Sequence, residues 1–145
     1  MANRLALDRF LPYRLSVASN RVSDRIASAY RAMFGLSIPE WRLVAVAAEA
    51  GSLTPAALGE RTAMDKVTVS RAAQALVARG LLARQAHASD RRSHLLALTP
   101  AGEALYARVA PEALRLEATL LAGFTRDEAA TLAALLRRLE EAARI

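Results

Sequence analysis

Apolar residues between positions 54 and 99 follow the period of helices first and that of strands afterwards. One apolar stripe recurs at i, i+3, i+4, i+7 and i+8, which is the spacing of a single helix face. It consists of Val69, Ala72, Ala73, Leu76 and Val77. Gly80 follows, and then two runs of strand length, LLARQAH and SHLLALT, joined by the polar segment ASDRR. The pattern predicts a helix closed by Gly80 and a β-hairpin after it.

A shorter helix is predicted directly before this one. Thr54 is a typical N-cap, Pro55 fits the first helical position, and AALGERTAM supplies about two and a half turns. Only the residues around Ala63 to Asp65 separate the two helices, as a helix-turn-helix requires. Two short helices followed by a hairpin give the order of a winged helix-turn-helix.

The outer face of the second helix carries side chains suited to DNA. Opposite the apolar stripe lie Val67, Ser70, Arg71, Gln74 and Ala78, with Thr68 at the edge. Arginine can bind guanine and glutamine can bind adenine through paired hydrogen bonds, while short side chains allow close approach to thymine methyl groups. Lys66 and the free N–H groups of the first turn suit a phosphate. For a single helix a solvated face is the alternative, and the helix-turn-helix context favours DNA.

The tip of the predicted hairpin adds a second basic element. Asp90 stands beside Arg91 and Arg92, so one guanidinium can pair with the carboxylate and leave the other for the minor groove of DNA. His94 follows on the second strand, where it packs or touches phosphate. The predicted DNA contacts are Thr54, Lys66, Val67, Thr68, Ser70, Arg71, Gln74, Asp90, Arg91, Arg92 and His94.

Several segments resemble the MarR (multiple antibiotic resistance regulator) family. The run DRRSHLLALT matches the D-x-R-x-x-x-x-x-L-T wing pattern of that family, and TPAG after the wing and LAALLRRLEE near the end are also similar to it. The resemblance covers nearly the whole chain. It implies a mainly α fold with a small β-hairpin, in which a single domain, 1–145, holds a winged helix-turn-helix at 37–99. The helices of 1–36 and 100–145 are then dimerisation helices.

The N-terminal part of the sequence predicts two further helices. A helical stripe runs from Leu11 or Pro12 to Phe34 and ends at Gly35. Ser37 and Glu40 then form a capping box for IPEWRLVAVAAEAG, a segment so apolar that we expect it to be buried on most sides.

The C-terminal part predicts two more. Thr99 and Pro100 begin a long helix that reaches towards Phe124 and is expected to kink at Pro111. Thr125 and Glu128 form a second capping box, and the last helix has a clear apolar face made of Ala129, Leu132, Leu135, Leu136 and Leu139. The apolar stripes of the terminal helices are larger than the middle of the chain can cover. This excess favours burial against a second copy of the chain. A monomeric closed bundle is the alternative.

The charge of the 145-residue chain is concentrated on the predicted winged segment. The net charge is +6, and residues 61–94 hold seven Lys or Arg against two Asp, a local charge of +5. Residues 1–60 hold seven basic and five acidic groups, and residues 95–145 hold six and seven. This distribution fits an electrostatic footprint for phosphate, so we predict double-stranded DNA as the partner.

Several classes of function are not supported by the sequence. No run of about 18 apolar residues or signal-peptide core occurs, so we expect a cytoplasmic protein without a membrane partner. Cysteine is absent, which excludes thiolate metal sites and thiol-based redox switches, and His87 and His94 lack clustered partners for a metal. We find no nucleophile with its base, no paired acids and no Gly-rich phosphate loop. We therefore expect no enzymatic activity, cofactor or metal.

A dimer with two DNA-reading helices predicts a pseudo-palindromic, inverted-repeat operator, and we expect the protein to act as a repressor by occupying a promoter. The resemblance implies a small effector, often an aromatic or phenolic anion, and its candidate contacts are Tyr13, Arg14, Trp41 and Arg42. Aromatic side chains that pack in the fold and arginines on its surface are the alternative for these four. For the whole protein, the alternative is a ligand-independent DNA-binding activator or an architectural protein.

Overall fold

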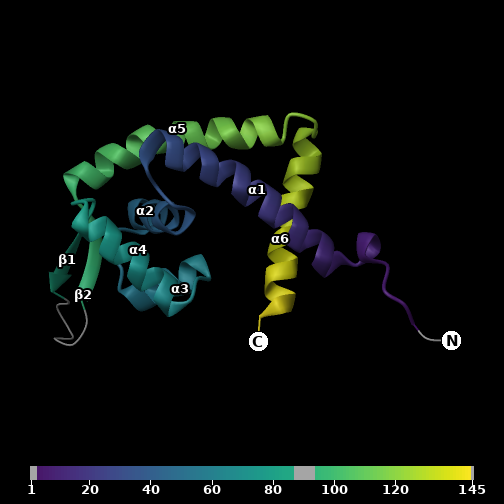
Figure 1. The fold of residues 1–145 in the computed structure, drawn as a ribbon, viewed down its shortest axis with the longest axis horizontal. Coiled ribbons are helices and arrows are strands. Elements are labelled where there is room, and N and C mark those ends of the chain that lie inside the picture. The colour runs from purple at the N-terminus through teal and green to yellow at the C-terminus, as the bar shows by residue number, and fades with distance from the viewer. Residues whose placement is uncertain (1–2, 87–93, 145) are drawn as a thin grey trace. The chain divides into compact units, whose positions relative to one another are not determined.

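The computed structural model describes residues 3–86 and 94–144 (Figure 1), and its α-helices begin where the sequence predicts, whereas the short 3-10 helix before them was not predicted. The chain divides into two compact units, Met1–Val109 and Ala110–Ile145, with the division inside one helix. The elements in order are η1 (Leu7–Arg9), α1 (Leu11–Phe34), α2 (Ile38–Ala50), α3 (Pro55–Thr62), α4 (Lys66–Ala78), β1 (Leu82–Ala86), β2 (His94–Leu98), α5 (Pro100–Leu120) and α6 (Arg126–Ala143).

Helix α2 occupies the centre of the first unit. It packs against α1, α3, α4 and β2, and it lies between α1 and the α3–α4 pair (Figure 1). Its capping box is confirmed, because the Ser37 N–H donates to a Glu40 carboxylate oxygen at 2.7 Å and the Glu40 N–H donates to Ser37 Oγ at 3.3 Å. Leu43, Val44 and Ala47 are buried, as expected for so apolar a helix.

The helix-turn-helix is formed by α3 and α4. The Ala57 N–H donates to Thr54 Oγ1 at 3.1 Å, which confirms Thr54 as the N-cap of α3. The turn that follows has Ala63 in the left-handed region, with φ of 54°. Gly80, with φ of 72°, follows the C-cap of α4, as predicted from the need for positive φ at that position.

The hairpin pairs β1 with β2 in antiparallel register, from Leu82 opposite Leu98 to Ala86 opposite His94. An isolated bridge between Leu53 and Leu96 joins the free edge of β2 to the segment before α3. The base of the wing is therefore fixed to the helix-turn-helix. His87, Asp90, Arg91 and Arg92 lie outside the described residues.

The junction between β2 and α5 depends on a glycine. Thr99 Oγ1 donates to the Gly80 carbonyl at 2.6 Å and accepts from the Gly102 N–H at 3.0 Å. A Cβ added at Gly102 would overlap the Leu81 carbonyl oxygen, so only glycine permits this close approach. Close packing against Leu81 thus explains the glycine in the TPAG segment, which resembles the family.

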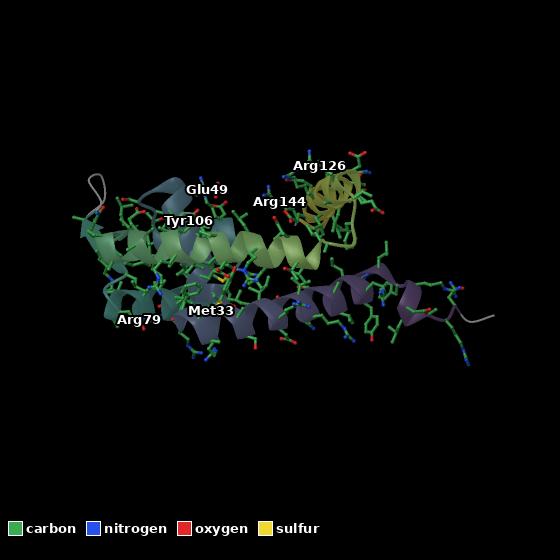
Figure 2. The ribbon with its side chains drawn as sticks, turned by 90° about the horizontal axis from the view of Figure 1, so that it is seen from above. Met33, Glu49, Arg79, Tyr106, Arg126 and Arg144 are labelled. Carbon is green, nitrogen blue, oxygen red and sulfur yellow. The ribbon has the colours of Figure 1, made fainter. Side chains whose placement is uncertain are left out.

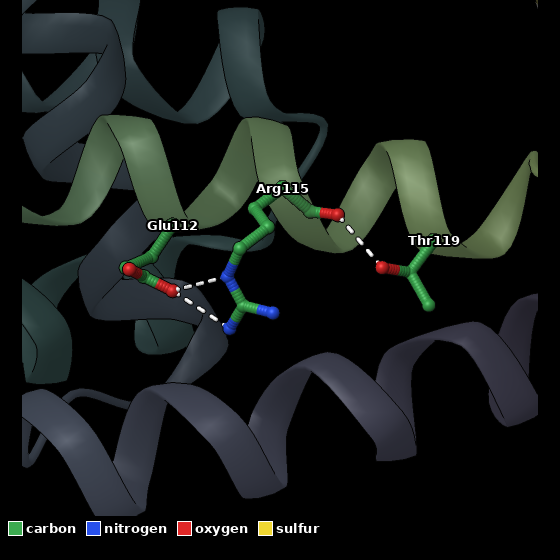
Figure 3. A network of polar contacts seen from close by, with 3 residues as sticks. All are labelled: Glu112, Arg115 and Thr119. Atoms are coloured by element: carbon green, nitrogen blue, oxygen red, sulfur yellow. Dashed lines mark hydrogen bonds and ion pairs between the residues drawn. The ribbon is translucent and has the colours of Figure 1, made fainter.

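The second unit contains the end of α5 and all of α6. Glu112 and Arg115 form an ion pair with an N–O distance of 2.7 Å, and Thr119 Oγ1 donates to the Arg115 carbonyl at 3.0 Å (Figure 3). Helix α5 continues through Pro111, where the expected kink stays a prediction. It ends at Leu120, short of the predicted Phe124, because residues 121–124 form a turn that contains Gly123 and leads into the extended N-cap of α6.

The capping box of α6 is confirmed, since the Thr125 N–H donates to Glu128 Oε1 at 2.8 Å and the Glu128 N–H donates to Thr125 Oγ1 at 3.1 Å. No described residue from 110 to 144 is buried, and the leucines of the apolar face are 38–49% exposed. No helix within the described ranges is long and apolar enough to cross a membrane.

Candidate nucleic-acid interface

The two faces of α4 differ in the way that the sequence predicts. Val69, Ala72, Ala73 and Leu76 are buried, and Val77 is half-buried. On the opposite face Ser70, Arg71 and Gln74 are exposed, and Val67 is 59% exposed. The inner face therefore fixes the helix in the core and leaves the outer side chains accessible.

A groove of about 980 Å³ lies between α3, α4 and the hairpin. Its apolar wall is formed by both helices and by Leu96 of β2. Six of the predicted DNA contacts line this groove, namely Lys66, Val67, Ser70, Arg71, Gln74 and His94. Gln74 Nε2 also donates to Ser70 Oγ at 3.4 Å, which holds the two side chains together one turn apart. The groove concentrates donors and acceptors beside short apolar side chains, as base edges in a major groove require.

The start of α4 is capped by a carboxylate. Asp65 accepts from the Thr68 N–H at 2.8 Å and from the Thr68 hydroxyl at 3.0 Å, and these bonds lower the Asp65 pKa below its ordinary 3.8. The Thr68 hydroxyl therefore donates its hydrogen to Asp65, and its oxygen can still accept a hydrogen bond from DNA. Because Asp65 brings a negative charge to the first turn, the phosphate site predicted there depends on Lys66.

Sequence reasoning missed two charged residues of the groove. Arg84 of β1 lines it together with His94, and Glu60 lines it from α3. Arg84 is paired with buried Leu96 and stands two residues after buried Leu82, so all three lie on one face of the hairpin, and this two-residue spacing was the available signal. Among the residues that the structure describes, the groove therefore holds three permanent cations, Lys66, Arg71 and Arg84, and one carboxylate, that of Glu60.

Arg79 contributes to the local charge of residues 61–94 but does not line the groove. Its Nη1 donates to the Gly35 carbonyl at 3.1 Å, and its Nη2 donates to the Phe34 carbonyl at 3.3 Å. Part of the basic charge assigned to DNA from the sequence therefore serves a contact inside the protein.

The four predicted ligand contacts are not brought together within one chain. Trp41 is half-buried, with its ring centroid 5.5 Å from that of Tyr30 and 5.9 Å from that of Tyr106, which stacks on it at 14° (Tyr106 in Figure 2). Burial raises the pKa of the Tyr30 phenol. Tyr13 lies seventeen residues before Tyr30 on α1, about 25 Å along the helix axis. Arg14 and Arg42 are exposed.

Comparisons with known proteins agree with this geometry. A model described as "MarR family" matches residues 34–93. The HTH-type transcriptional regulator PecS of Dickeya dadantii is 30% identical over 131 residues, covering 88% of this chain and 76% of that protein.

Two solved structures show the similarity in three dimensions over most of the chain. A MarR/EmrR family transcriptional regulator from Acinetobacter sp. ADP1 has a TM-score of 0.87 at 26% identity, covering 94% of this chain and 96% of the other. A mutant MarR from E. coli, solved in complex with operator DNA, has a TM-score of 0.82 at 25% identity, covering 94% and 99%.

Proposed function

The chain belongs to the MarR family of transcriptional regulators, and from this premise we propose that it is a homodimeric repressor that reads an inverted-repeat operator through α4. The observation that supports the proposal most is the groove beside α4, where Arg71, Gln74 and Ser70 lie with Lys66 and Arg84. A buried inner face holds the backbone of α4 in place, so only the outer side chains have to become ordered when DNA binds.

Arg71 and Gln74 are the proposed base-reading residues. A guanidinium can donate to guanine O6 and N7, and a carboxamide can bond adenine N6 and N7. Lys66 and Arg84, which line the same groove, are proposed to bind phosphate and so to set the register of the protein on the duplex. The sequence assigns one of Arg91 and Arg92 to the minor groove beside each half-site, with the other paired with Asp90.

The dimer is supported by apolar side chains that the single chain leaves exposed. On α1, Leu11 is 74% exposed and Leu15 is 42% exposed, and the apolar face of α6 has no buried residue. A two-fold axis would present two α4 helices to half-sites about 10 base pairs apart, or a multiple of that distance. A small effector would then act by favouring another separation of the two helices, with Tyr13, Arg14, Trp41 and Arg42 as its predicted contacts.

A fluorescence-anisotropy titration tests the proposal. The protein is titrated against the intergenic DNA beside its own gene and against a scrambled duplex, at several salt concentrations. We expect strong preference for the first duplex, two protomers per site and a steep salt dependence. Weak, equal binding to both duplexes would favour an architectural role and would reject an operator at that position.

Variants of the groove identify which residues read bases. Arg71→Ala or Gln74→Ala should cost about 1 to 3 kcal/mol on the preferred duplex and much less on the scrambled one. Arg25→Ala removes an exposed arginine of α1 and is the matched control for net charge. Equal losses on both duplexes would assign Arg71 or Gln74 to phosphate instead.

A further inference from the structure

The end of α4 is joined to the end of α1 by a single side chain. Arg79 is the C-cap of α4, and its two terminal nitrogens donate to two successive carbonyls, those of Phe34 and Gly35. These groups lie in the last turn of α1 and its cap, where a helix leaves carbonyls without internal partners. The guanidinium thus caps a helix that lies 44 residues earlier in the chain.

Within the described ranges no other hydrogen bond joins α1 to α4. The rest of α4 is held by apolar packing of Val69, Ala72, Ala73 and Leu76, and such packing has little directional preference. A guanidinium is planar and presents its N–H groups in a fixed fork, so two bonds from it define an orientation. Arg79 therefore provides the directional contact between the end of α4 and the end of α1.

The same end of α1 also contacts α5. The guanidinium of Arg108 lies 5.6 Å from the centre of the Phe34 ring, in the geometry of a cation–π contact. Phe34 is therefore linked to α4 through its carbonyl and to the first half of α5 through its ring. A shift of the last turn of α1 would change both contacts together.

We propose that Arg79 is a positioning residue that couples the orientation of α1 to that of α4 and thereby sets the spacing of half-sites that the protein accepts. The inference rests on the proposed dimeric DNA binding, in which α1 contributes to the interface and α4 reads the operator. Arg79 itself touches no DNA in this arrangement, because it bonds the carbonyls of α1 and does not line the groove.

The variants Arg79→Lys and Arg79→Gln separate this role from that of a simple positive charge. The probes are an operator selected by the wild-type protein from random duplexes and copies of it with one base pair added to or removed from the spacer. The wild type should discriminate strongly between spacers. In both variants the ratio of dissociation constants between shifted and native spacers should fall about fivefold or more, because lysine keeps the charge but has no fork.

Four results would contradict the inference. Wild-type behaviour of Arg79→Lys would mean that only the charge matters. An equal loss on all spacers, with a salt slope smaller by about one, would mean that Arg79 binds a phosphate. If the wild-type protein selects no preferred duplex, the proposed function is rejected, and the spacing mechanism with it. If the wild type is selective and both variants behave like it, only the role of Arg79 is rejected.

A distance measurement gives a readout that a loss of stability alone would not reproduce. The chain has no cysteine, so Ala78→Cys places one spin label on the exposed end of α4 in each protomer. Pulsed electron paramagnetic resonance should give a narrow distance distribution for the otherwise wild-type dimer and a broader one with Arg79→Lys. Equal widths would contradict the inference, and Arg25→Lys is the matched control.

Discussion

Helices α2 and α6 begin in the same way and have opposite environments. Each starts with a hydroxyl N-cap and a glutamate three residues later, and both reciprocal bonds of the capping box are present in each. Yet α2 buries Leu43, Val44 and Ala47, while α6 buries no described residue. A local signal decides where a helix begins, and only the surrounding chain decides whether its apolar face is covered.

The contrast extends to the two compact units. Every buried residue in the described ranges belongs to Met1–Val109, and Ala110–Ile145 has an apolar face without a core of its own. Helices of the first unit that bury their own stripes, such as α2 and α4, should have a stability independent of protein concentration, whereas α1 leaves Leu11 and Leu15 exposed. A unit that depends on a partner should become more stable as the concentration of that partner rises.

The largest expected effect separates the two kinds of leucine. Leu76 lies on the buried face of α4. Leu76→Ala should lower the free energy of unfolding by about 2 to 5 kcal/mol because it leaves a cavity. Leu135→Ala, on α6, should change it by about 0.5 kcal/mol or less at low protein concentration. Urea titrations measure both. Similar costs for the two variants at low concentration would mean that α6 is covered within one chain.

The next effect concerns the partner of α6. The double variant Leu132→Glu, Leu136→Glu should raise the dissociation constant of the dimer about a hundredfold or more by placing charges on an apolar interface. Analytical ultracentrifugation measures the shift. Ala130→Glu with Ala134→Glu adds the same charges to exposed positions on the opposite side of α6 and should leave the dimer intact. Equal shifts in the two double variants would argue against this face as the interface.

Removal of the two hydroxyl caps should have smaller and unequal effects. Ser37→Ala should cost about 1 kcal/mol of global stability, because α2 lies in the core of the first unit. Thr125→Ala should fray the start of α6 and leave the main urea transition of the first unit in place. Urea titrations followed by circular dichroism distinguish the two results. An equal shift of the main transition in both variants would contradict the expected difference between α2 and α6.

The smallest expected effect on stability comes from Asp65, the N-cap of α4. Its carboxylate can be protonated, whereas the hydroxyl caps of α2 and α6 carry no titratable charge. Bonds from Thr68 lower the pKa of Asp65 in the folded protein below 3.8, so its contribution to stability is present above that pH and is lost as the pH falls through the lowered value. Asp65→Asn keeps an acceptor oxygen without a proton to gain. Its stability should fall less steeply below pH 3.8 than that of the wild type. Identical slopes would exclude Asp65 as a source of acid sensitivity.

The sequence predicted those features that depend on neighbours along the chain. Thr54, Ser37 and Thr125 were recognisable as caps, and the stripe from Val69 to Leu76 was recognisable from its period. In the groove, Lys66, Arg71 and Gln74 followed from the projection of one helix. Each of these features repeats a local spacing that elementary helix geometry explains.

The features that sequence reasoning missed depend on residues that are distant along the chain. The bonds of Arg79 cross 44 and 45 residues, and a positive charge gives no sign of whether it will meet a phosphate or a helix end. Arg84 reaches the groove through the pairing of β1 with β2. Trp41 was considered as a ligand contact, and its stack with Tyr106 joins α2 to a helix that begins after the hairpin.

That stack gives the protein a natural optical probe. Trp41 is the only tryptophan in the chain, and the Tyr30 and Tyr106 rings lie 5.5 and 5.9 Å away, within easy range of energy transfer from tyrosine to indole. Its emission therefore originates where α1, α2 and α5 meet. Any event that separates these helices will change the wavelength and intensity of that emission, so the movement can be followed in unlabelled protein and in real time.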